Sequence, residues 1–302
     1  MYTVLVCTLS CVAVSLADNI KVLCTTFPVY QITQNVAQGR KSVDVQLMLS
    51  AQLGCPHDYV LTPQDMKKIA SADVLVVNGL GLEEFLGAPA KNAKPDLKIV
   101  DSSSGIGDLL KYDDEAAHAA AGEGHVHFVM NPHLFASPRM AAKMAGAIAA
   151  GLAGIDPGGA ELYKQNADAY ATRMNKLADE LAALGKTLKN NRIVTQHGVF
   201  DYLARDAGIE VVAVLQEHAG QEPSAAEMIR LVKTVRSRNA GAICTEPQYA
   251  STVGRTIAAE TGVPVVTLDP AATGPQDASL DYYEGVMRKN METLKQTLGV
   301  RK

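Results

Sequence analysis

The chain has 302 residues, which at about 100–200 residues per domain predicts two globular domains. Hydrophobic residues make up 47% of the chain and charged residues 20%, with no long biased tract, so a folded protein is expected rather than a disordered one. The formal net charge is -4 without any strongly basic stretch, which argues against a nucleic-acid-binding protein, because such binding depends on phosphate neutralisation.

The first element of the chain is an apolar run at residues 2–16. It ends in the small-x-small pattern Ser15-Leu16-Ala17, so we expect a signal peptide over residues 1–17 and an exported protein without a membrane-spanning helix. No Lys or Arg precedes the run, which indicates a start site recorded too far downstream or an atypical signal. A buried N-terminal strand is the alternative, and the context of Cys11 argues against lipid attachment there.

Cleavage after Ala17 would leave three cysteines, Cys24, Cys55 and Cys244, which allow at most one disulfide and one free thiol. No C-x-x-C motif occurs, which excludes the ordinary zinc ribbon and the thioredoxin-type redox motif. Cys55 lies two residues before His57, so it is either a small apolar residue in a packed turn or a neighbour of a metal. We leave it outside the predicted ligand set.

Short β-branched runs alternate with longer amphipathic segments along the rest of the chain. This alternation predicts two α/β lobes, each with a mostly parallel four-stranded sheet. The predicted strands are 21–24, 43–47, 74–77 and 98–100, then 192–195, 210–214, 241–244 and 263–267.

A long helix is predicted between the lobes, from about Asp156 to Lys189. Its apolar seam consists of Tyr163, Tyr170, Met174, Leu177, Leu181, Leu184 and Leu188. Asp156 is the expected N-cap, with Pro157 at the first helical position. A coiled-coil arm is the alternative, but a single stiff connector fits better, since no other segment offers a partner heptad. We therefore predict a first lobe at 18–155, a connecting helix at 156–189 and a second lobe at 190–302.

The segment 113–124 is rich in Ala, Gly and acidic residues. It contains His118, and His125 and His127 follow it closely. This pattern indicates a flexible loop that carries imidazoles, either as an auxiliary metal-binding loop or as solvated histidines without a role.

Three histidines and one aspartate are the candidate metal ligands. His57 follows a strand, His133 stands in Asn131-Pro132-His133, and His197 and Asp269 stand at the carboxyl ends of predicted strands. Ligands collect at that end of open α/β sheets, and two candidates come from each lobe, so a site between the lobes would unite them. Three imidazoles and one carboxylate would suit tetrahedral Zn²⁺. Glu246, also at a strand end, could be a general base in an enzyme, but hydrogen bonding at the lobe interface is the preferred interpretation.

These motifs resemble, in chain order, the cluster A-I metal-binding solute receptors, the zinc and manganese receptors of bacterial ABC importers. The resemblance covers nearly the whole chain after residue 17. It rests on Thr26 to Tyr30, Gly54 to Tyr59 with Thr62-Pro63, Ala72-Asp73, Asn78 to Glu83, Asn131 to His133 with Ser137-Pro138, His197 to Leu203, Glu246 to Gln248, and Leu268 to Pro270. At the position of Asn131 the family more usually has Asp.

The resemblance implies two α/β lobes joined by a long rigid helix, with the metal between them and delivery to a membrane permease. It identifies His57, His133, His197 and Asp269 as ligands. His at the third position is typical of zinc receptors, whereas manganese receptors usually place Glu there, in line with the preference of Mn²⁺ for oxygen donors. The loop histidines look like a short version of the His-rich loop of many zinc members.

The sequence therefore predicts a periplasmic, monomeric, non-enzymatic zinc receptor that serves an ABC permease in the inner membrane. The first alternative is a manganese or iron receptor of the same family. A secreted zinc hydrolase, with three His ligands and a metal-bound water, is an alternative of a different class. The sequence does not speak for or against a role as an adhesin.

Overall fold

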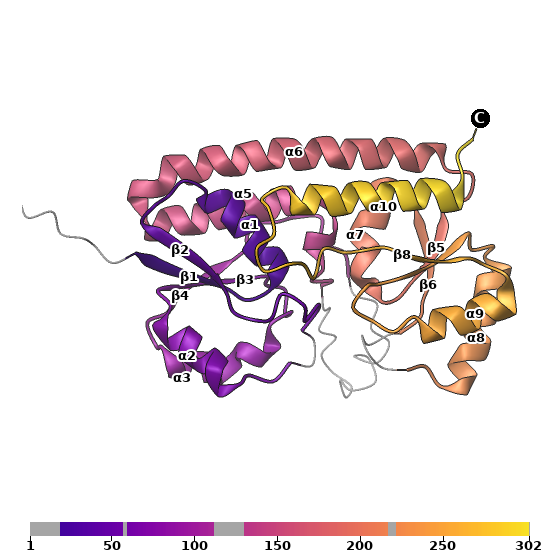
Figure 1. Ribbon diagram of the computed structural model, residues 1–302, viewed down its shortest axis with the longest axis horizontal. Coiled ribbons are helices and arrows are strands. Elements are labelled where there is room, and N and C mark those ends of the chain that lie inside the picture. The colour runs from indigo at the N-terminus through magenta and orange to yellow at the C-terminus, as the bar shows by residue number, and fades with distance from the viewer. Residues whose placement is uncertain (1–18, 57–58, 112–129, 217–221, 302) are drawn as a thin grey trace, which may run out of the picture.

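The computed structural model describes residues 19–56, 59–111, 130–216 and 222–301. It has two α/β lobes side by side, and helices run across the top of both (Figure 1). The predicted signal peptide, His57 and the loop histidines His118, His125 and His127 lie outside the described residues.

The first lobe is built on a parallel sheet with the strand order β2-β1-β3-β4. Alternate residues of its strands face opposite sides, so Val22 packs with α1 and α5, while Leu23 packs with the layer of α2 and α3. Its elements are β1 (Ile20–Cys24), α1 (Phe27–Ala37), β2 (Val43–Leu47), α2 (Pro63–Ser71), β3 (Val74–Val77), α3 (Gly87–Ala93), β4 (Lys98–Asp101) and α5 (Pro138–Ile155).

The second lobe repeats this arrangement with the parallel order β6-β5-β7-β8. Val194 and Ile243 pack on one side with α8 and α9, and Ile193 and Ala242 face the side of α7. Its elements are β5 (Arg192–Thr195), α7 (Asp201–Ala207), β6 (Glu210–Val214), α8 (Ala225–Ser237), β7 (Ala242–Thr245), α9 (Thr252–Thr261) and β8 (Val265–Thr267). The predicted fold of two lobes with four parallel strands each is confirmed.

Short 3-10 turns mark several of the junctions between these elements. They are η1 (Glu84–Leu86), η2 (Leu134–Ala136), η3 (Pro157–Gly159) and η4 (Gly198–Phe200).

The long helix α6 (Ala160–Thr187) has 28 residues and so extends about 42 Å across both lobes. Its predicted seam faces inward, and Tyr163, Tyr170 and Met174 are buried. Asp156 stands at the N-cap position of η3, with Pro157 directly after it, but α6 itself begins three residues after Pro157, at Ala160. The Asp156 carboxylate makes no capping bond; it pairs with Arg40 at 2.9 Å and accepts a hydrogen bond from the Tyr163 hydroxyl at 2.6 Å.

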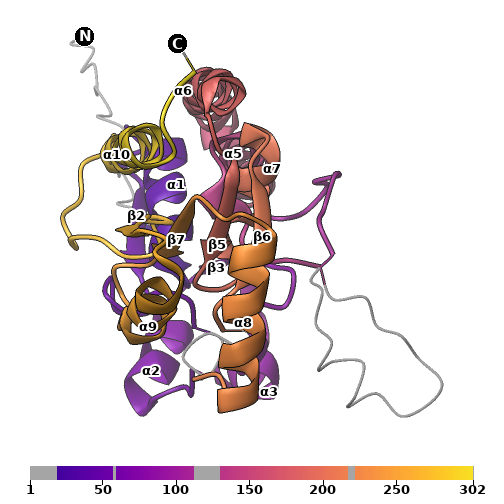
Figure 2. The ribbon, with the colours of Figure 1, turned by 90° about the vertical axis from the view of Figure 1, so that its right-hand side faces the viewer.

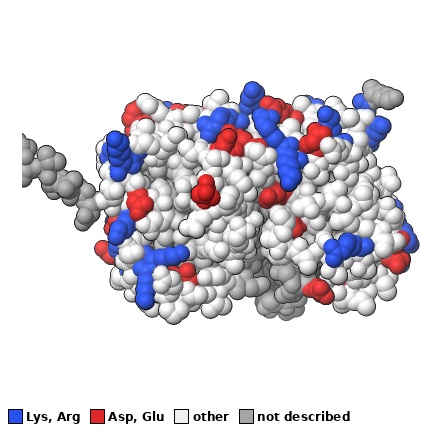
Figure 3. Space-filling model, viewed as in Figure 1, with Lys and Arg blue, Asp and Glu red and all other residues white. Residues whose placement is uncertain are grey.

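A second helix, α10 (Tyr282–Leu298), lies alongside α6 (Figures 1 and 2). Ion pairs join the two helices: Arg173 with Glu284 at 2.7 Å, and Arg288 with Glu180 at 2.6 Å. Figure 3 shows basic and acidic side chains next to one another along this upper part of the molecule. The connector is therefore not a lone helix, because α5 and α10 both pack against it.

The segment that leads into α10 returns to the first lobe. The Gly274 amide donates to the Ala51 carbonyl at 3.0 Å, and the Asn35 side chain donates to the Leu280 carbonyl at 3.0 Å. Part of the predicted range 190–302 thus packs on the other lobe. Within the described parts of the chain, no helix combines the length and the apolar character that a membrane span requires.

Candidate metal centre

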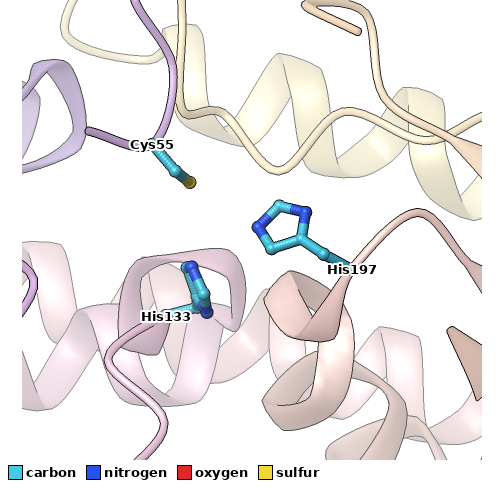
Figure 4. Close-up of side chains that lie close together, drawn as sticks. All are labelled: Cys55, His133 and His197. Carbon is cyan, nitrogen blue, oxygen red and sulfur yellow. The ribbon is translucent and has the colours of Figure 1, made fainter. Parts of the chain in front are cut away.

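Three side chains that could hold a metal ion meet between the lobes. Cys55 comes from the loop between β2 and α2, His133 directly precedes η2, and His197 follows β5 by two residues. One ligand atom from each lies within 4.8 Å of the others. Figure 4 shows the thiol and both imidazoles directed toward a common centre. The structure thus brings together two of the four predicted ligands, and the two lobes both contribute.

His133 is held in one orientation by Asn131. The Asn131 Oδ1 lies 2.9 Å from His133 Nδ1 and also accepts a hydrogen bond from the His133 backbone amide at 2.9 Å. This oxygen can only accept from the ring, so Nδ1 carries the proton and Nε2 offers its lone pair to the centre. The ring is fully buried, at 0% exposure.

The amide nitrogen of Asn131 reaches across to the second lobe. It donates to the Gly198 carbonyl at 2.8 Å and to the Asp201 carboxylate at 2.9 Å. One side chain therefore orients a histidine of the first lobe and anchors it to the loop and helix that follow His197. Burial raises the pKa of Asp201 to about 6, although the Asn131 hydrogen bond and the charge of His197 act in the opposite direction.

His197 has a carboxylate partner. Its Nδ1 lies 2.6 Å from Oε1 of Glu246, and both side chains are at 0% exposure. Glu246 directly follows β7, and Gln248 donates a hydrogen bond to its other oxygen at 2.6 Å. A carboxylate on the far nitrogen fixes the ring and raises the basicity of Nε2, as in many zinc sites. Glu246 therefore contacts the predicted ligand itself, at the lobe interface where hydrogen bonding was expected.

Cys55 is partly buried beside this pair. Burial raises the pKa of its thiol well above the usual value, and the charge of Glu246 adds to the rise, so the metal-free chain carries a neutral thiol. The ligand set predicted from the sequence left Cys55 out, but the structure places its sulfur next to the imidazoles of His133 and His197. Its position two residues before His57, in the loop that follows a strand, was the signal that could have included it.

Asp269 follows β8 by two residues, as predicted, but its carboxylate does not belong to the group of Cys55, His133 and His197. Its Oδ1 accepts a hydrogen bond from the Ala271 amide at 2.8 Å. Burial raises the pKa of the Asp269 carboxyl. It also lines a pocket of about 570 Å³ together with Ser279, Asp281, Tyr282, Glu284, Gly285, Val286, Arg288 and Lys289. Ligation by Asp269 stays a prediction, as does ligation by His57.

Comparison with known proteins gives a consistent result. The profile of the family "Zinc-uptake complex component A periplasmic" (ZnuA) matches residues 22–297. The chain is 29% identical to the high-affinity zinc uptake system protein ZnuA of Bacillus subtilis over 95% of this chain and 90% of that protein. It is 31% identical to the zinc-binding lipoprotein AdcA of Streptococcus pneumoniae over 92% of this chain, but it spans only 56% of that longer protein.

A solved structure supports the fold as well as the sequence relation. The solute-binding protein FpvC of Pseudomonas aeruginosa in complex with Mn²⁺ aligns with a TM-score of 0.80 and 28% identity, over 93% of this chain and 99% of that one. The family profile covers almost all of the described chain, and the two-lobe architecture agrees with it. The chain therefore belongs to the ZnuA family, the periplasmic receptor components of zinc-uptake complexes.

Proposed function

We propose that this chain is a receptor that captures Zn²⁺ between its two lobes and delivers it to an ABC-type importer. The observation that carries the proposal is the pair of buried imidazoles, each with an oxygen atom of a neighbouring side chain next to Nδ1, so that both present Nε2 to one centre. Two neutral imidazoles favour Zn²⁺ over Mn²⁺. The names of the Bacillus and Streptococcus relatives support zinc as the cargo.

The remaining features of the proposal come from the sequence. The protein is exported and periplasmic, acts as a monomer with a permease of the inner membrane, and catalyses no reaction. His57 and Asp269 complete the ligand set, and His118, His125 and His127 form an auxiliary metal loop. The Mn²⁺ complex of the similar solute-binding protein FpvC keeps manganese as the second candidate cargo.

The test is a metal analysis of the purified chain, followed by competition titration of stripped protein with Zn²⁺ and Mn²⁺. One tightly held zinc that manganese does not displace, and that the His197→Ala variant loses, is the expected result. A triple variant that replaces His118, His125 and His127 by Ala serves as the control and should keep this zinc. Preferential binding of manganese would refute zinc as the cargo, and the absence of tight metal would refute the receptor.

The dependence on pH gives a second test of the imidazole site. Protonated histidine cannot ligate a metal, so zinc affinity should fall as the pH drops through about 6.5. An affinity that stays constant between about pH 5 and 8 would contradict this ligand set. A metal-bound water, together with unchanged zinc affinity in Asp269→Ala, would favour the hydrolase alternative.

A further inference from the structure

Cys55 differs from the other described cysteines in its surroundings. Cys24 and Cys244 are buried in strands β1 and β7, within the hydrophobic core. Cys55 instead lies in a loop at the lobe interface with its sulfur beside the two imidazoles (Figure 4). We propose that the Cys55 sulfur is itself a metal ligand, so that a mixed nitrogen and sulfur site selects Zn²⁺ over Mn²⁺. This inference rests on the proposed function and changes its ligand set: a tetrahedral zinc takes four ligands, so Cys55 would occupy the place that the sequence gave to Asp269, whose carboxylate lies outside the group.

The backbone before Cys55 is shaped to bring the sulfur to the centre. Gly54 has φ +79°, a left-handed conformation that favours glycine, and a Cβ at this position would lie 3.0 Å from Cγ of Gln248. The loop of the first lobe thus approaches the second lobe closely. Gln248 also donates to Glu246, the partner of His197, at 2.6 Å. The side chain of Gln248 therefore lies next to the loop that carries Cys55 and also contacts Glu246, the partner of His197.

The distances are those that a single ion can bridge. Zinc binds imidazole nitrogen at about 2.0–2.1 Å and thiolate sulfur at about 2.3 Å, so two ligands of one tetrahedral ion lie roughly 3.5 Å apart. The ligand atoms of Cys55, His133 and His197 lie within 4.8 Å of one another, so an approach of about 1 Å brings them onto one ion. On binding, a Zn–S bond forms and the thiol proton leaves to solvent, without any change of oxidation state.

The sulfur ligand has a consequence for selectivity. Thiolate is a soft donor that suits Zn²⁺, whereas Mn²⁺ prefers carboxylate, carbonyl and water oxygens. Replacement of the sulfur by a hydroxyl should therefore weaken zinc much more than manganese. We expect a loss of at least about tenfold in zinc affinity, because even the loss of an outer partner of a ligand costs about 10–100-fold.

The experiment is cobalt spectroscopy of the full chain and of its Cys55→Ser variant. Co²⁺ in the wild-type site should show visible d–d bands and a sulfur-to-cobalt charge-transfer band in the near ultraviolet. The variant should keep the d–d bands and lose the charge-transfer band. All other cysteines remain in the variant, so the lost band reports on Cys55 alone. The Zn²⁺ and Mn²⁺ affinities of both proteins are then measured by competition titration.

The outcomes separate the two proposals. A wild-type cobalt complex with d–d bands but no charge-transfer band, and equal zinc affinity in both proteins, would overturn ligation by Cys55 and leave the receptor intact. A wild-type chain that binds neither Co²⁺ nor Zn²⁺ would overturn both. If the variant misfolds, iodoacetamide labelling of wild-type Cys55 decides: stoichiometric zinc should slow it, and an unchanged rate would refute the inference.

Discussion

Replacement of Asp201 by Asn tests the electrostatics of the lobe interface. Burial raises the pKa of the Asp201 carboxyl from 3.8 to about 6, so the folded chain binds this proton more tightly than the unfolded chain does. Stability from this group is therefore complete below about pH 4 and is lost as the pH rises through about 6. A shift of about two units corresponds to about 3 kcal/mol, as an upper value. The Asp201→Asn variant cannot ionise, and its side-chain oxygen can still accept the hydrogen bond from Asn131.

We expect the metal-free variant to exceed the wild type in unfolding free energy by up to about 3 kcal/mol at pH 7.5, and to match it near pH 4. Urea denaturation of both proteins at several pH values, with a chelator present, measures this difference. The exposed Asp277, changed to Asn, is the matched control and should show no such dependence. A difference that is the same at every pH, or that is larger in acid, would refute the reasoning.

Three further predictions concern packing, capping and the support of a ligand. Gly185→Ala would place a Cβ 1.7 Å from a backbone oxygen of α7 and should cost about 3 kcal/mol or more in urea denaturation, whereas Gly154→Ala, with open space around it, should be neutral or stabilising. Thr62→Ala removes the capping box of α2 and should lower the unfolding free energy by about 1 kcal/mol; an equal loss in Thr62→Ser would contradict this explanation. Glu246→Gln should weaken zinc about 10–100-fold in a competition titration, while the exposed Glu84→Gln should bind zinc like the wild type.

The strands could be predicted because the sheets are parallel, and a strand that is covered on both faces, such as Val74 to Val77, is a continuous apolar run. The long helix could be predicted from the 3.6-residue period of its buried seam. Asp156 was misjudged because the pattern of a cap does not reveal a competing partner, and Arg40 is 116 residues away in the chain. The return of the segment before α10 to the first lobe has no local signal at all, since it depends on contacts between distant segments.

The site shows the same division between local and distant information. His133 and His197 could be found because each occupies a strand end or loop motif that has a chemical meaning by itself. The roles of Asn131, Glu246 and Cys55 depend on which atoms they meet across the lobe interface. Asn131 in particular has a clear function only when His133, Gly198 and Asp201 are in place around it. Sequence pattern thus finds ligands more readily than the groups that orient them.

The helices and hydrogen bonds that join the two lobes form a frame around the site, and this frame indicates where selectivity between metals must come from. The helix α6 runs across the two lobes, ion pairs join it to α10, and the chain before α10 is hydrogen-bonded to the first lobe. Asn131 adds a bridge directly beside the centre. Such a frame opposes large opening and closing, so little discrimination can arise from a conformation that only one metal induces. The choice between metals then depends on the atoms already facing the centre, and a soft sulfur beside two imidazoles shifts that choice toward Zn²⁺.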